Sequence, residues 1–237
     1  MTRQRKADLL LVLITGFWGC SYYLSDLALG EMPPFALCAM RFLLAFALLG
    51  IVLFPKLRHV NRKTLLWAVP AGLSLTLTYI GATVGLLYTS ISNAGFICSL
   101  PAVTTPLLTF LVYRKKPERR MLLCLALCTV GLGLLTLGND FRPAPGDLIC
   151  LLCALGYGIN LLVVEHAVRQ PEVDALQLGV FQQLVTGTAM LVLSLLFETP
   201  CLPRTPTGWG SVLFLSVFCT GIAFAITAVQ QKHTSAV

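Results

Sequence analysis

The chain has 237 residues, of which 57% are apolar and only 11% charged, and its mean hydropathy is +0.83. A soluble domain carries about 25% charged residues, so this composition excludes an ordinary soluble protein and indicates a membrane protein. The formal net charge of +7 would suit nucleic acid, but the basic residues form short clusters between apolar runs, which favours a topological signal and no nucleic-acid partner.

Eight apolar segments follow one another along the chain. Each is close to the length of about 20 residues that crosses the hydrocarbon core as a helix, and most other backbone structures would leave polar groups unpaired in lipid. The predicted fold class is therefore an all-α polytopic membrane protein. We predict its spans near residues 9–29, 34–54, 66–87, 92–112, 121–138, 148–168, 176–197 and 209–229.

The basic residues alternate from loop to loop. Fourteen lysines and arginines precede the first span or follow the second, fourth, sixth and eighth, whereas only Arg142 and Arg204 lie in the opposite loops. Cytoplasmic loops carry the excess of lysine and arginine. We therefore predict a multi-pass protein of the plasma membrane, the inner membrane in a bacterium, with a cytoplasmic N-terminus.

The two halves of the chain share a pattern. With a shift of 139 residues, Asp8 falls on Asp147, and Trp18-Gly19 falls on Tyr157-Gly158. Because five spans per repeat is an odd number, the second copy must be inverted in the membrane. We predict a first five-helix repeat over 1–138, an external linker over 139–146, and an incomplete second repeat of three helices over 147–237.

Several motifs resemble a known family. They are Trp18-Gly19, Pro33-Pro34 with Arg41-Phe42, Ser92-Asn93-Ala94-Gly95, Pro106 with the basic loop after it, and Gly146-Asp147 with Gly156-Tyr157. In order and spacing the chain resembles the drug/metabolite transporter superfamily, specifically its EamA-type members. The resemblance implies ten helices in two inverted repeats of five and movement of a small-molecule substrate (a metabolite, amino acid or drug). We predict a secondary transporter using alternating access.

The chain ends before the last two helices that the resemblance implies. The sequence therefore leaves an alternative open, a truncated membrane component that either does not transport or depends on dimerisation as a homodimer. An enzyme is not expected, because the chain contains no P-loop, nucleophile elbow or H-E-x-x-H. The C-x-x-C of Cys150 and Cys153 lies in a span without a histidine cluster, so we predict no metal site, no cofactor and no catalytic residue.

Aromatic side chains at mid-membrane depth are the first candidates for a substrate site. Thr15, Trp18, Tyr22 and Asp26 share one helix face because they follow at three- and four-residue steps. Trp18 and Tyr157 reach similar depths from opposite sides, by helical rise. These residues either line a cavity for an organic solute or fill space between helices, and Asp26 could also serve an outer gate.

Arg41 is the sharpest single candidate, because an ionisable group at depth is costly and usually faces the protein interior or a watery cavity. It could pair with Asp26 or Glu31, contact a carboxylate or other anionic substrate, or snorkel to the outer interface. Interhelical hydrogen bonding and packing are the alternatives for the weaker candidates. These are Tyr79, Asn160, Gln182 and Gln183 as substrate-binding residues, and Pro106 as a hinge for gating.

Overall fold

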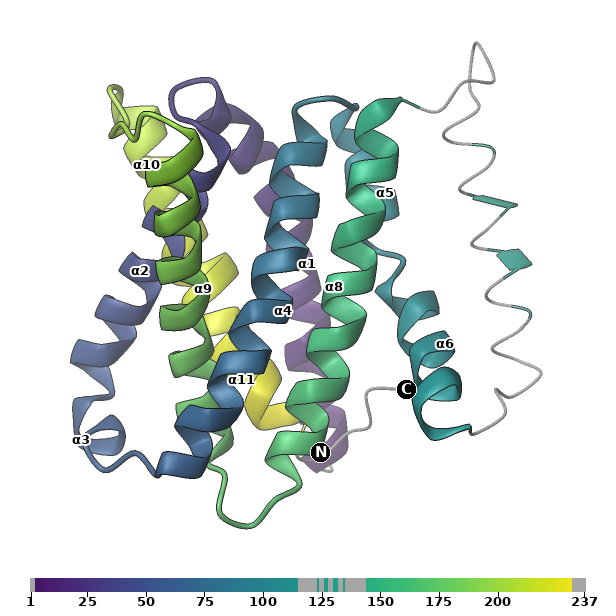
Figure 1. Cartoon of the computed structure of the whole chain (residues 1–237), viewed down its shortest axis with the longest axis vertical. Helices are drawn as coiled ribbons and strands as arrows, with labels where there is room; N and C mark the ends of the chain where they lie inside the picture. The colour runs from purple at the N-terminus through teal and green to yellow at the C-terminus, as the bar shows by residue number, and fades with distance from the viewer. Residues whose placement is uncertain are drawn as a thin grey trace.

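The computed structural model describes residues 3–114 and 144–231, together with a few positions between 123 and 134. All regular structure in these residues is helical (Figure 1). The helix expected over 121–138 lies almost entirely outside the described residues, and so does Arg142. The all-α fold predicted from hydropathy is confirmed.

The helices follow the expected spans closely. In chain order they are α1 (Arg3–Leu29), α2 (Pro34–Val52), α3 (Phe54–Leu57), α4 (Arg62–Leu86), α5 (Ile91–Ile97), α6 (Pro101–Tyr113), α8 (Pro145–Val168), α9 (Ala175–Phe197), α10 (Pro206–Phe214), a π-helical turn (Leu215–Ile222) and α11 (Ala223–Gln230). Among the described residues, six segments are long and apolar enough to cross a membrane: α2, α4, α5 with α6, α8, α9, and α10 through α11. The 27-residue α1 stands beside them in the same bundle (Figure 1).

Two of the expected single spans are interrupted. The fourth breaks between Ile97 and Pro101, because proline has no N–H to continue the helix. The break therefore falls at Pro101, while Pro106 sits inside α6. The eighth span widens into a π-helix over Leu215–Ile222, and such turns occur frequently at functional sites.

The two halves run in opposite directions. In Figure 1, α1 and α4 rise from the end where the chain begins, whereas α8 and the path from α10 to α11 descend toward that end. The helix pairings correspond as well, since α4 packs on α8 in the middle of the bundle and α1 packs on α10 through α11. This is the arrangement that an inverted repeat requires, although the boundaries at 138 and 147 stay a prediction.

Glycines allow α4 and α8 to approach until their backbones touch. A Cβ on Gly81 would lie 2.3 Å from the backbone nitrogen of Cys153, and one on Gly156 would lie 2.7 Å from that of Thr78. Small residues at such an interface let membrane helices pack closely. The seam therefore fixes α4 against α8, which lie side by side in Figure 1.

Candidate functional site

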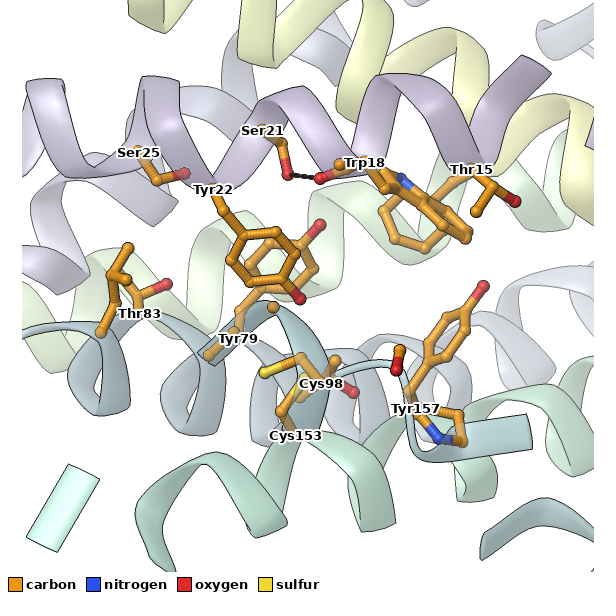
Figure 2. A pocket seen from close by; sticks show the side chains of 18 of the residues that line it. Thr15, Trp18, Ser21, Tyr22, Ser25, Tyr79, Thr83, Cys98, Cys153 and Tyr157 are labelled. Carbon is orange, nitrogen blue, oxygen red and sulfur yellow. Dashed lines mark hydrogen bonds between the residues drawn. The ribbon is translucent and has the colours of Figure 1, made fainter. Parts of the chain in front are cut away.

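A cavity of about 360 Å³ lies among the helices of both halves. Its size falls at the lower end of the range for small-molecule sites, about 300–1,000 Å³. Figure 2 shows the side chains converging on it from α1, α4 and α8. The lining residues that carry the argument below are Thr15, Trp18, Tyr22, Ser25, Arg41, Tyr79, Thr83, Cys98, Cys153, Tyr157 and Phe224.

The α1 wall of the cavity follows directly from helical spacing. Thr15, Trp18, Tyr22 and Ser25 succeed one another at three- and four-residue steps, and all four line the cavity. Asp26 belongs to the same helix but is exposed and lies outside the lining. The structure therefore brings the aromatic residues of this face together and leaves the carboxylate out.

Aromatic rings form the deep part of the cavity. The rings of Trp18 and Tyr157 meet edge to face with centroids 5.5 Å apart, and Phe224 lies 5.5 Å from Trp18. Tyr79 is seated edge-on against the buried Phe42 at 4.6 Å. Such arrangements are the ones that aromatic quadrupoles favour. The two aromatic residues aligned by the internal repeat therefore face the same space.

The π-helical turn fixes two of these cavity residues. The Nε1–H of Trp18 donates to the carbonyl oxygen of Cys219 at 3.0 Å, and Nε of Arg41 donates to the hydroxyl oxygen of Thr220 at 2.9 Å. Both acceptors belong to the segment Leu215–Ile222. The irregular turn thus orients an indole from the first helix and a guanidinium from the second.

Arg41 is buried, with only 3% of its surface exposed. Its guanidinium carbon lies 4.8 Å from the centre of the Tyr79 ring, and its Nη2 has no hydrogen-bond acceptor among the described residues. Arg41 pairs with neither Asp26 nor Glu31. Glu31 instead accepts hydrogen bonds from the backbone nitrogens of Arg204 and Thr205, at 2.8 and 3.1 Å. The burial also argues against snorkelling.

The other polar groups of the cavity wall are uncharged. Of the described lining residues, Arg41 alone carries a charge, and the rest of the polar surface consists of hydroxyl and thiol groups. The C-x-x-C of α8 takes part, because Cys153 lines the cavity together with Cys98, and Cys150 packs in the same buried cluster. Figure 2 shows Cys98 and Cys153 beside each other below Tyr79.

Besides Asp26, four of the residues predicted from the sequence are not brought to this cavity. Asn160 is buried between helices, where its Nδ2 donates to the carbonyl oxygen of Ala71 at 2.8 Å and lies 3.4 Å from Oε1 of Gln182. Gln183 donates to the carbonyl oxygen of Gly179 within α9 at 3.0 Å and to that of Gly221 in the π-helical turn at 3.4 Å. Pro106 is buried within α6 and does not line the cavity. Asn160, Gln182 and Gln183 therefore take the interhelical role left open for them.

Several cavity residues were not singled out from the sequence. Ser25 extends the predicted face of Thr15, Trp18 and Tyr22 and could have been found by continuing the same steps along α1. Cys98 reaches the cavity only because the chain breaks before Pro101, and Phe224 only because of the π-helical turn before it. Hydropathy carries no signal for either irregularity.

With this geometry established, comparison with known proteins identifies the family. The EamA-like transporter family matches residues 5–137 and again residues 144–237. The chain belongs to this family. Its match confirms the resemblance predicted from the motifs of the first and second halves.

Two relatives of this chain are described as uncharacterized transporters. One, from Archaeoglobus fulgidus, is 33% identical over 167 residues, which are 70% of this chain and 51% of that protein. The other, YetK from Bacillus subtilis, is 25% identical over 237 residues, covering 94% of this chain and 70% of its own length. The chain thus spans about half the length of the Archaeoglobus relative.

The fold is also similar to that of a solved structure. A crystal structure titled only as that of a protein superimposes with a TM-score of 0.72, covering 96% of this chain and 79% of the other. The two sequences are 20% identical, so the likeness concerns the fold alone. The same arrangement of helices therefore also occurs in a solved structure.

Proposed function

We propose that this protein is a secondary transporter that moves a small organic solute across the cell membrane. The single observation that carries the proposal is the cavity of about 360 Å³ near the middles of α1 and α8. Its walls come from both halves of the chain. In many secondary transporters with inverted repeats, substrate sites lie near the membrane midplane at the repeat interface.

Trp18, Tyr22, Tyr79 and Tyr157 would bind the solute directly. Their rings offer flat apolar faces, while the hydroxyl groups of the tyrosines lie among hydroxyl and thiol groups of the same wall. Small-molecule sites typically combine an apolar lining with a few placed polar groups. Asn160, Gln182 and Gln183 would act behind this layer by holding the helices in register.

Alternating access would follow from rocking one half of the bundle against the other. The described structure has irregular backbone at two places beside the cavity, the break before Pro101 and the π-helical turn at Leu215–Ile222. Irregular backbone at membrane depth is tolerated where it is buried in protein or lines a cavity. These two places are the proposed hinges, in preference to Pro106.

The orientation proposed is the one that the loop charges predict. In the described part, Arg58, Arg62, Lys63 and Arg169 lie in loops or at helix ends near the beginning of α1 (Figure 1), whereas Arg204 lies at the opposite end. By the positive-inside rule the first end is cytoplasmic. The N-terminus would then face the cytoplasm. The homodimer raised from the sequence stays a prediction.

Solute counterflow in reconstituted vesicles tests the proposal. Vesicles containing the full chain are loaded with one unlabelled organic solute, which is a carboxylate, an amine, a neutral compound or a cation. They are then diluted into the labelled form of the same solute. A carrier produces transient accumulation of the label, which vesicles without protein do not. Failure of every chemical class to produce counterflow, with protein shown to be inserted and monodisperse, would contradict transport by this chain.

A further inference from the structure

The guanidinium of Arg41 is a buried positive charge without a protein counter-ion. The structure describes the side chains of seven aspartates and glutamates, and none of these lies within 4.0 Å of Arg41. Its hydrogen bond goes to the neutral hydroxyl of Thr220. Removing a charge from water costs several kcal/mol unless it is paired. Something other than these carboxylates is therefore needed to compensate it.

The described carboxylates are engaged elsewhere, apart from the exposed Asp26. Glu31 binds the loop before α10, and Glu198 accepts from the backbone nitrogens that begin α2, at 2.9 Å each. Asp147 and Asp174 accept from backbone nitrogens at the starts of α8 and α9. The remaining two, Glu165 and Glu172, form ion pairs with Arg169 and Lys63. The charge of Arg41 is thus left facing the cavity.

We propose that the solute bound in this cavity is a carboxylate with a compact aromatic or apolar body and no cationic group. The inference rests on the proposed function and assigns its substrate class. A carboxylate matches the planar donor fork of arginine and can engage two of its N–H groups. It would supply the acceptor that Nη2 lacks, while the rings of Trp18 and Tyr157 receive the flat body of the solute.

The charges in the cavity wall favour a simple carboxylate over an amino acid as the solute. An amino acid would bring an ammonium group as well as a carboxylate into the cavity. The described lining offers no carboxylate to receive it, only hydroxyls, thiols and ring faces. A buried unpaired ammonium is costly. The site therefore favours a net negative solute, and its volume limits the body to about one ring.

The fluorescence of Trp18 provides a direct test that does not depend on transport. Trp67 and Trp209 lie outside the cavity lining, so replacing both by Phe leaves Trp18 as the sole reporter. Phenylacetate, its neutral isostere phenylacetamide, and phenylalanine are titrated into the purified full chain. We expect saturable binding of phenylacetate with Kd below about 10 mM, and binding of the other two at least about tenfold weaker, or about 1.4 kcal/mol.

Substitution of Arg41 then assigns the preference to this residue. Arg41→Gln should abolish the preference for phenylacetate while retaining weak binding of phenylacetamide, which also shows that the cavity is intact. Arg41→Lys keeps the charge and should keep part of the preference. Thr220→Val removes the partner of Nε but not the charge, and should leave most of the preference in place.

Three results would overturn the inference. They are equal affinity for phenylacetate and phenylacetamide, phenylalanine binding as tightly as phenylacetate, and a preference unchanged in Arg41→Gln. Absence of saturable phenylacetate binding would count against it in the same way. Because no flux is measured, failure of transport is separable: charge-dependent binding without counterflow would contradict the proposed function and leave the carboxylate site standing.

Discussion

Replacement of Gly81 by alanine tests the seam that positions the cavity. The added Cβ would lie 2.3 Å from the backbone nitrogen of Cys153, 2.9 Å from the carbonyl carbon of Leu152 and 3.0 Å from the Cα of Cys153. The first distance falls about 1.1 Å short of the 3.4 Å at which ordinary contact begins. Since the obstructing atoms are backbone, no side chain can rotate away, and α4 and α8 must move apart.

The expected cost follows from two opposing effects. Overpacking a close interface costs about 1–3 kcal/mol, and a clash with backbone belongs at the upper end of this range. Replacing glycine by alanine within a helix stabilises the helix by up to about 1 kcal/mol. The net destabilisation is therefore about 2 kcal/mol, which lowers the unfolding midpoint by about 4–8 °C at 2–4 °C per kcal/mol for a chain of this size.

A thiol-reactive fluorogenic dye reports the unfolding directly, because Cys150 and Cys153 are buried at this seam. Gly50→Ala is the matched control, since nothing lies within 4 Å of a Cβ at Gly50, and it should leave the midpoint unchanged or raise it. A midpoint for Gly81→Ala equal to that of the parent protein would refute the argument from close packing. An equal loss in both variants would refute it as well.

Two further outcomes are expected. The pKa of Glu31 is lowered by hydrogen bonds from the Thr205 hydroxyl and from the backbone nitrogens of Arg204 and Thr205. Its ionised form therefore stabilises the fold above the unfolded pKa of about 4.3, and this stabilisation is lost as pH falls through the lower folded pKa. The thermal midpoint of the parent protein should exceed that of Glu31→Gln at neutral pH and converge with it in acid, whereas a pH-independent difference would contradict the assignment. The rate at which a small methanethiosulfonate modifies Cys98, measured by mass spectrometry, should fall when phenylacetate is bound. The rate for Cys201, which lies outside the cavity lining, should stay unchanged. Equal protection of both thiols would contradict occupancy of this cavity.

The membrane fold was predictable from the sequence because its physical cause is local. A run of about 20 apolar residues must be a helix in lipid, and this condition needs no knowledge of the neighbours. The inverted direction of the second half followed from counting spans and loop charges. The break before Pro101 is a local effect of proline, but its consequence, which is to place Cys98 in the cavity wall, depends on where α5 and α8 meet.

The site was predictable only where one helix face carried enough residues. The spacing of Trp18 and Tyr22 placed both on one helix face. Tyr157 was found because the internal repeat aligns it with Trp18. Gln182 and Asn160 have the depth of cavity residues, yet depth does not tell which neighbour a side chain faces. Glu31 as a partner for Arg41 was a reasonable expectation that failed because backbone nitrogens more than 170 residues away compete for the carboxylate.

Solute flux in a matched pair of glycine variants tests the central claim most directly. Among the described residues, only Tyr22 Cδ2, at 3.9 Å, lies within 4 Å of a Cβ on Gly95. Gly95→Phe therefore places a ring in the cavity, whereas Gly50→Phe adds the same ring away from it. If the solute passes through this cavity, counterflow is lost in Gly95→Phe and retained in Gly50→Phe at equal protein content. Undiminished counterflow in Gly95→Phe would contradict the account.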